Sequence, residues 1–276
     1  MKVIIADSAG FCWGVERAVR MAIEATETGK RVYLLGEVIH NSEVIRDLER
    51  RGAVLVSSPD QVDDREGLLV IRAHGVPKKV KERAKELGIT VVDGTCPFVE
   101  RVQQLAEGFE ISGRVPIIVG KAGHPEVQGV LGHTRSGVVV EKVEDVDMLP
   151  EMRKVGVVSQ TTWNREEFRM ICRRIEERFE DVVVKDTICP TTRARIEGAR
   201  RLAMDVDLMI VIGDRSSSNT THLAEECSRI TRTYLVGKAD EIDPSWLHGV
   251  ESVGITGGAS TPRWMIEEVA RKLERI

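Results

Sequence analysis

Three cysteines in closely similar local sequence are the residues of this chain best suited to chemistry. Each follows a short apolar stretch, an aspartate and a small loop, and each precedes a helical pattern of apolar residues. The three units are IIADSAGFC ending at Cys12, VVDGTC ending at Cys96 and VVVKDTIC ending at Cys189. One unit falls in each third of the chain, so the sequence predicts a threefold internal repeat.

The position of these thiols favours a metal centre. Amide groups and the helix dipole at a helix N-terminus lower the pKa of a thiol and favour thiolate. A nucleophile needs one thiolate, whereas three equivalent ones suit a metal. Structural zinc sites usually draw on closely spaced cysteine or histidine pairs. A cubane iron–sulfur cluster normally takes four cysteines, so three would leave one iron open. The alternative is that the three cysteines are core residues. Cys172 and Cys227 lie inside helical patterns, and we expect both to be passive core or surface thiols.

Polar loops at other strand-to-helix junctions carry hydrogen-bond donors. Histidine, hydroxyl and amide donors at helix N-termini are typical of phosphate and diphosphate sites. The residues in question are His40, His74, His124, Ser217, Ser218, Asn219 and Ser260. They would allow a chain with a net charge of −4 to hold an anion.

Glu126 follows His124-Pro125 at the predicted start of a helix. An acid there is common because the helix dipole favours it. A second reading is a proton donor or relay that faces the metal centre and acts with the hydroxyl of Thr161. The spacing alone leaves both readings open.

The elements that must position these residues alternate between strand and helix along the whole chain. This alternation is typical of α/β folds with parallel sheets, in which ligands bind beyond the carboxyl ends of the strands. We therefore expect three small α/β domains in a pseudo-threefold trefoil around a central site. The expected domains are residues 1–96, which include the N-terminal strand, residues 97–186 and residues 187–276.

Composition narrows the function classes. The net charge of −4 argues against nonspecific nucleic-acid binding. No apolar run reaches the roughly 18 residues of a membrane span, and Asp7 comes too early for a signal peptide. We expect a cytoplasmic protein with reduced thiols and no membrane partner.

Motifs in all three thirds of the chain carry a family resemblance. They are AGFCWGV around Cys12, GEVIHN at 36–41, RAHGV at 72–76, DGTCP at 93–97, GHPEV at 123–127, QTT at 160–162, SSNT at 217–220 and GASTP at 258–262. In this order they closely resemble the 4-hydroxy-3-methylbut-2-enyl diphosphate reductases, iron–sulfur oxidoreductases that end the methylerythritol phosphate route of isoprenoid biosynthesis. The one departure is Ser216, where the family pattern leads us to expect asparagine.

The resemblance implies a specific reaction. A [4Fe–4S] cluster bound by Cys12, Cys96 and Cys189 would keep one iron open for the substrate hydroxyl. The diphosphate of the allylic substrate would be held by His40, His74, His124, Ser217, Ser218, Asn219 and Ser260. Glu126, with Thr161, would deliver the proton that lets the hydroxyl leave as water. Two electrons and two protons would give isopentenyl and dimethylallyl diphosphate.

The source of the electrons and two other protein classes stay open at this point. The chain has no glycine-rich nicotinamide or flavin fingerprint, so an external carrier, a ferredoxin or flavodoxin, is expected. One alternative is another three-cysteine [4Fe–4S] enzyme such as a quinolinate synthase, which should lack the His-Pro-Glu and Ser-Ser-Asn motifs. The other is a zinc- or phosphate-binding protein without redox chemistry.

Overall fold

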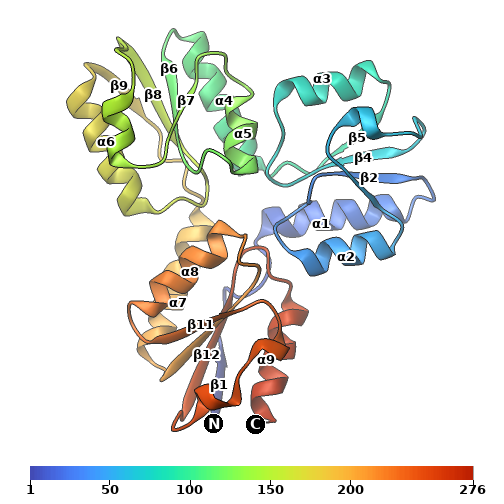
Figure 1. Ribbon diagram of the computed structural model, residues 1–276, viewed down its shortest axis with the longest axis vertical. Coiled ribbons are helices and arrows are strands. Elements are labelled where there is room, and N and C mark those ends of the chain that lie inside the picture. The colour runs from blue at the N-terminus through green and yellow to red at the C-terminus, as the bar shows by residue number, and fades with distance from the viewer. Residues whose placement is uncertain (276) are drawn as a thin grey trace. The chain divides into compact units, whose positions relative to one another are not determined.

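Strands alternate with helices, as the sequence predicts. The computed structural model describes residues 1–275, and their strands form three four-stranded parallel sheets (Figure 1). The first sheet has the order β3 (Val54–Val56), β2 (Val32–Leu35), β4 (Leu68–Ile71), β5 (Thr90–Asp93). The second has the order β7 (Val138–Val140), β6 (Val115–Val119), β8 (Lys154–Ser159), β9 (Asp181–Val184). The third has the order β11 (Arg232–Val236), β10 (Leu208–Ile212), β12 (Ser252–Gly257), β1 (Lys2–Ile5).

The three sheets share one design, which confirms the predicted α/β class and its internal repeat. Each sheet has two inner strands and two outer strands. One outer strand follows the first inner strand in sequence, and the other outer strand leads to a cysteine. The cysteine strands β5, β9 and β1 therefore occupy the same edge position, next to β4, β8 and β12.

The N-terminal strand corrects one part of the sequence prediction. We expected it to belong with residues 1–96. It pairs instead with the last sheet, with Val3 opposite Val253, and Ile5 at its end is 39% exposed. Within residues 1–275, β12 is the last strand and leads into a helix, and β1 lies beside it at the edge of the sheet. The N-terminal strand fills that edge.

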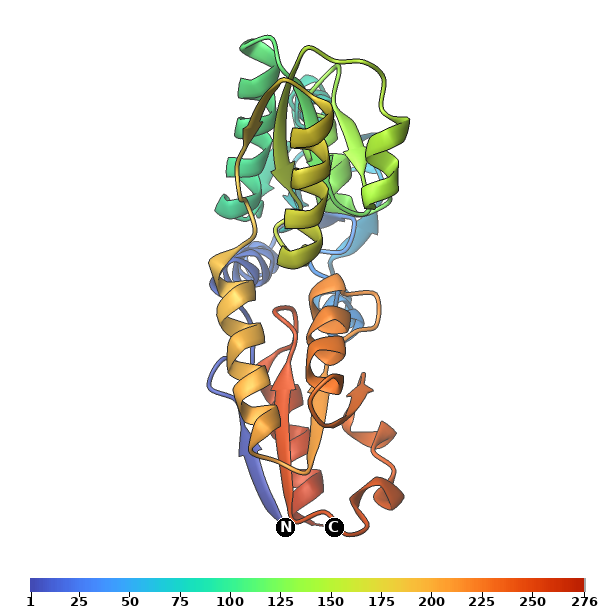
Figure 2. The same ribbon diagram turned by 90° about the vertical axis from the view of Figure 1, so that its left-hand side faces the viewer.

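Helices cover both faces of the sheets (Figures 1 and 2). They are α1 (Trp13–Thr26), α2 (Ser42–Arg50), α3 (Lys78–Glu86), α4 (Pro97–Ile111), α5 (Pro125–Leu131), α6 (Arg165–Arg178), α7 (Pro190–Met204), α8 (Ser218–Ser228) and α9 (Arg263–Glu274). The inner strands are buried on both sides, which explains their continuous apolar sequence. In β10, Ile210 packs with Ile266 of α9, whereas Val211 faces Leu223 of α8.

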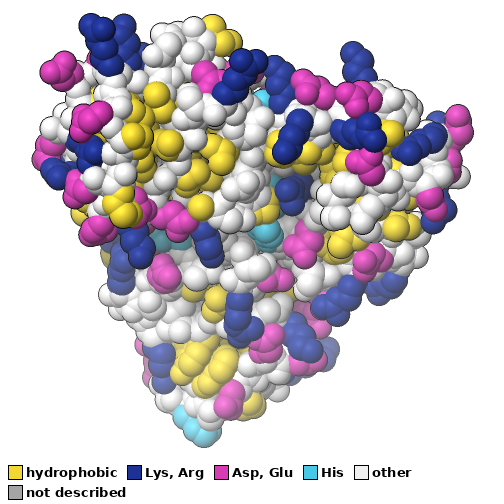
Figure 3. Space-filling view, turned by 45° about the horizontal axis from the view of Figure 1, so that its top comes forward, with side chains coloured by type: hydrophobic (Ala, Val, Ile, Leu, Met, Phe, Trp, Pro, Cys, Tyr) yellow, Lys and Arg dark blue, Asp and Glu magenta, His cyan; other side chains and the backbone are white. Residues whose placement is uncertain are grey.

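The chain folds as two compact units. The first unit comprises residues 1–16, residues 40–45 and the chain from Pro190 onward, and the second comprises residues 17–39 and 46–189. The domain boundaries expected at residues 96 and 186 stay a prediction. Lysine and arginine side chains are interspersed with aspartate and glutamate on the face drawn in Figure 3. Within residues 1–275, no helix has the length and apolar character needed to cross a membrane.

Candidate active site

The three cysteines are held by the same backbone hydrogen bond. The Cys96 amide donates to the Ala73 carbonyl at 2.9 Å, and the Cys189 amide donates to the Thr161 carbonyl at 2.9 Å. In the first unit, the Cys12 amide donates to the Ala259 carbonyl at 3.1 Å. Each acceptor lies just after the inner strand that pairs with the cysteine strand. The three sequence units therefore place their cysteines at equivalent positions, and each half-buried cysteine lies directly before a helix.

Side chains fix the loops that lead to the cysteines of the second unit. Asp93 accepts hydrogen bonds from the amide and the hydroxyl of Thr95, at 2.9 and 2.5 Å. The hydroxyl of Thr187 accepts the amide hydrogen of Ser159 at 2.7 Å, which ties the loop before Cys189 to the end of β8. These contacts explain why an aspartate and a threonine recur before the cysteines.

The two remaining cysteines have a different environment. Cys172 of α6 and Cys227 of α8 are buried in the core, and burial raises the pKa of each thiol to about 12. Both are neutral thiols near neutral pH, in agreement with the passive role expected for them.

Two predicted histidines of the second unit lie against each other. His74 sits in a tight turn in which the Gly75 amide donates to the Arg72 carbonyl at 3.0 Å and Gly75 adopts a φ of +70°. Its ring meets the ring of His124 edge-on, with centroids 5.4 Å apart. Nδ1 of His124 accepts the Glu126 amide hydrogen at 3.2 Å and caps α5. A neutral ring that accepts at Nδ1 carries its proton on Nε2, which is then a donor.

Glu126 and Thr161, which one of the two readings of the sequence paired, are in direct contact. One carboxylate oxygen of Glu126 accepts the Thr161 amide hydrogen at 2.6 Å, and the other accepts the Thr161 hydroxyl hydrogen at 2.8 Å. Because the Thr161 carbonyl also binds the Cys189 amide, this threonine links the acid to a cysteine loop. Of the two readings of Glu126, the proton relay gains support from this geometry.

Burial raises the pKa of Glu126 toward neutral pH. Glu126 is only 2% exposed. Loss of hydration raises the pKa of its carboxyl to about 7, against two hydrogen bonds from Thr161 that favour the charged form. A carboxylic acid with this pKa is available as a proton donor near pH 7.

The first unit holds the predicted hydroxyl and amide donors at the start of α8. Ser217 caps this helix by accepting the Thr220 amide hydrogen, and its hydroxyl oxygen accepts a hydrogen bond from the Ser260 hydroxyl at 3.3 Å. Both serines are buried, and Ser218 is half-buried. Asn219 is 5% exposed, and its side-chain amide nitrogen finds no hydrogen-bond partner among residues 1–275. An amide donor buried in this way fits an absent anionic ligand.

His40 reaches the same part of the first unit through its neighbour Asn41. The Asn41 side-chain oxygen accepts the Glu43 and Val44 amide hydrogens, and its nitrogen donates to the Ser260 carbonyl at 2.9 Å. An asparagine directly before a helix is a common helix cap. The second contact of Asn41 joins the histidine segment to the serine loop, and nothing in the local sequence signals it.

The serine that departs from the family pattern has a local role. The amide and hydroxyl of Ser216 donate to Asp214 at 2.9 and 2.8 Å. Although burial opposes this, these bonds hold the pKa of the Asp214 carboxyl below its usual value, with a contribution from the charge of His40.

The predicted site residues therefore form two sets. Cys12, His40, Ser217, Ser218, Asn219 and Ser260 belong to the first unit, and Cys96, Cys189, His74, His124, Glu126 and Thr161 belong to the second. Within the second unit the acid, the threonine and a cysteine loop are in contact. Their assignment to substrate and cluster stays a prediction.

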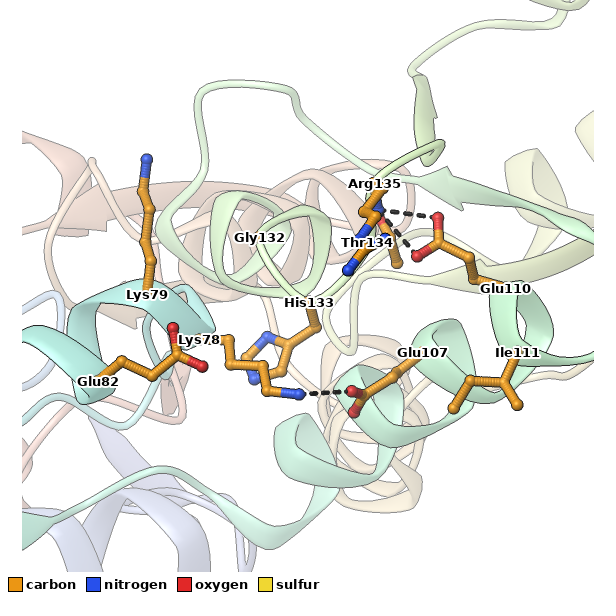
Figure 4. Close-up of a pocket in the computed structure, with 10 residues that line it drawn as sticks. All are labelled: Lys78, Lys79, Glu82, Glu107, Glu110, Ile111, Gly132, His133, Thr134 and Arg135. Atoms are coloured by element: carbon orange, nitrogen blue, oxygen red, sulfur yellow. Dashed lines mark hydrogen bonds and ion pairs between the residues drawn. The ribbon is translucent and has the colours of Figure 1, made fainter.

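A separate pocket of about 540 Å³ in the second unit contains none of these residues (Figure 4). Lys78 and Glu107 form an ion pair across it at 2.8 Å, and Glu110 accepts the amide hydrogens of Arg135 and Ser136. The pocket is therefore distinct from the candidate active site.

Comparisons with known proteins agree with the motif resemblance. A family described as LytB protein matches residues 3–274. A protein of Geotalea uraniireducens (strain Rf4) named 4-hydroxy-3-methylbut-2-enyl diphosphate reductase is 42% identical, and the match covers 100% of this chain and 98% of that protein. The protein of the same name from Pelobacter propionicus is 41% identical, with 100% and 99% covered.

Solved structures agree as well. A reductase structure described as the terminal enzyme of the non-mevalonate pathway matches with a TM-score of 0.77 and 38% identity over 100% of both chains. The reductase from Plasmodium falciparum matches with a TM-score of 0.92 and 27% identity, over 98% of this chain and 87% of the other. These matches set aside the quinolinate synthase alternative. The chain belongs to the LytB family, the family of the 4-hydroxy-3-methylbut-2-enyl diphosphate reductases.

Proposed function

We propose that this protein reductively removes the hydroxyl group of (E)-4-hydroxy-3-methylbut-2-enyl diphosphate, giving isopentenyl and dimethylallyl diphosphate. The allylic C–O bond breaks, and two electrons and two protons are consumed. One proton leaves with the oxygen as water, and the other ends on the carbon skeleton. An external ferredoxin or flavodoxin would supply the electrons.

The contact between Glu126 and Thr161 carries this proposal. Hydroxide is a poor leaving group, so the reaction needs a proton at the departing oxygen. When Glu126 is protonated, its acidic hydrogen can be donated to the Thr161 hydroxyl oxygen, and the threonine can pass its own hydrogen onward. A pKa of about 7 allows this acid to give up its proton and recover it in each cycle.

A [4Fe–4S] cluster bound by Cys12, Cys96 and Cys189 fits the donor set of the chain. Each cysteine precedes a helix, where thiolate is favoured, and the Cys96 side chain does not cap its own helix. When bound, such a cluster would supply electrons singly and a Lewis-acidic iron for the leaving oxygen.

The remaining donors would hold and orient the diphosphate. His124 would present its Nε2 proton, and Ser217 and Asn219 would offer hydroxyl and amide hydrogens at the start of α8, where the helix dipole favours an anion. Ser260 would add a hydroxyl hydrogen from the loop between β12 and α9. His40, His74 and Ser218 would complete this set. Such donors bind phosphate oxygens without requiring a net positive protein.

Anaerobic purification followed by a turnover assay tests the proposal. The protein should contain about four iron and four sulfide per chain, as expected for one cubane cluster. With a chemical reductant it should convert the hydroxylated diphosphate to both products. A colourless protein that contains zinc and no sulfide would contradict the cluster assignment and revive the non-redox alternative. An intact reduced cluster that leaves the substrate unconsumed would contradict the reaction.

A further inference from the structure

Arg195 of α7 is buried beside the loop that carries Cys12. The side chain is 4% exposed. Its Nη1 donates to the Gly257 carbonyl at 2.8 Å and also to the Ser8 carbonyl. Gly257 ends β12, and Ser8 lies in the segment between β1 and Cys12. The guanidinium thus bridges the two chain segments that meet at the Cys12 amide.

Close packing of α7 supports this bridge. Gly198 lies one turn after Arg195 on the same helix, and a Cβ added at Gly198 would come to 3.4 Å from the Ser8 hydroxyl. The helix backbone therefore runs close to the Cys12 loop. In the second unit, Arg17 of α1 makes a similar but half-buried contact with the Thr95 carbonyl at 3.2 Å, next to Cys96.

Among residues 1–275, no carboxylate pairs with the charge of Arg195, and its Nε has no hydrogen-bond partner. Burial lowers the pKa of Arg195, and the charge of Cys12 opposes that change. Because a guanidinium stays protonated in proteins, a buried one needs a nearby anion. Cys12 is the group whose charge acts on Arg195 in this environment.

We propose that Arg195 is a positioning residue for the cluster: it holds the Cys12 loop in place, and its buried positive charge favours the reduced, more negative state of the cluster. One-electron reduction adds a negative charge, which a cation stabilises more strongly at a water-poor site than in bulk water. This inference rests on the cluster assignment of the proposed function and adds a determinant of its reduction potential.

The test compares the midpoint potentials of the cluster-loaded protein and three variants. Arg195→Gln removes the charge, Arg195→Lys keeps it, and Arg201→Gln is a matched control at an exposed position of the same helix. Iron and sulfide contents are measured first, and potentials follow from anaerobic redox titration monitored by electron paramagnetic resonance. Neither measurement depends on turnover.

Arg195→Gln should weaken reduction by about tenfold or more, which is a shift of about 59 mV to lower potential for one electron. Arg195→Lys should shift it by less than half as much, and Arg201→Gln should match the wild type. If Arg195→Gln fails to hold the cluster, a loaded Arg195→Lys with a near wild-type potential still supports the inference.

Two results would overturn it. One is a fully loaded Arg195→Gln with the wild-type potential. The other is an Arg195→Lys that loses the cluster, or shifts the potential, as much as Arg195→Gln does, because the charge would then not be the determinant. A wild-type protein that lacks iron and sulfide would instead refute the cluster assignment on which the inference depends.

Discussion

Replacing Glu126 by glutamine tests the proposed proton donor most directly. The amide has nearly the same shape as the acid and can keep the bond from the Thr161 amide, now 2.6 Å long. It cannot release a proton at any accessible pH. Burial of the side chain, at 2% exposure, means that water cannot readily replace the lost donor.

The expected loss follows from the part played by general acids. A positioned proton donor contributes about 10² to 10⁴ in rate. Glu126→Gln should therefore lower kcat by about two to four orders of magnitude. Cluster content and substrate affinity should stay close to those of the wild type, because Glu126 itself holds neither group in this proposal.

The pH dependence gives a second, independent signature. The donor must be protonated, so activity should be full below the pKa of about 7 and should fall as pH rises through it. Between pH 6 and pH 8 the protonated fraction falls from about nine-tenths to about one-tenth. The residual activity of Glu126→Gln should lack this descending limb.

Single-turnover measurements with pre-reduced protein and an excess of a chemical reductant, which supplies the second electron, are the appropriate assay, because they do not depend on delivery of electrons by a protein carrier. Glu166→Gln is the matched control, since Glu166 lies exposed in the first turn of α6. Glu126→Gln turnover within threefold of the wild type, with the same pH profile, would refute the relay. Equal loss of activity in Glu166→Gln would show that the effect is not specific.

Three further predictions concern stability and binding. Because the folded state raises the pKa of Glu126 from 4.5 to about 7, it binds more protons than the unfolded state. The stabilisation is present below pH 4.5 and is lost as pH rises through about 7. Denaturant titrations should therefore show that the free energy of unfolding of the wild type falls by about 3 kcal/mol relative to that of Glu126→Gln as pH rises over that range. Equal pH dependence of unfolding in the two proteins would contradict this. Gly75→Ala would place a Cβ 2.4 Å from the Gln103 side chain at a φ of +70°, so both Tm and diphosphate affinity should fall. Gly108→Ala is the control, because its Cβ would enter open space and should not lower Tm. Ser217→Ala should raise KM through loss of a phosphate donor and cost about 1 kcal/mol through loss of the helix cap, and an unchanged KM would remove Ser217 from the binding set.

Local signals made much of the fold predictable from the sequence. Short apolar runs, polar loops and helical periodicity recur in each third of the chain, and these properties depend only on near neighbours. The position of each cysteine directly before a helix follows from the same signals. The pairing of β1 with β12 could not be predicted in this way, because it joins the two ends of the chain and depends on which sheet lacks an edge strand.

The chemistry of the site could be predicted from the sequence less well than the identity of its residues. Glu126 could be assigned to a helix start, but its pKa depends on complete burial and on Thr161, which is far away in sequence. Arg195 gave no signal at all, because an arginine in a helix of mixed polarity is usually exposed. Its burial depends on the packing of α7 against the Cys12 loop, and only the folded chain shows that contact.

The repeated backbone hydrogen bond explains how three cysteines that are far apart in sequence occupy equivalent positions in their repeats. Each cysteine amide donates to a carbonyl of the neighbouring strand-end loop, and the acceptor residues are Ala73, Thr161 and Ala259. A backbone carbonyl is present whatever the side chain, so the side chains at these positions are free to differ between repeats. Thr161 differs in this way and binds Glu126. The same backbone plan that positions a cysteine thus leaves room, in one repeat of the three, for a proton donor next to it.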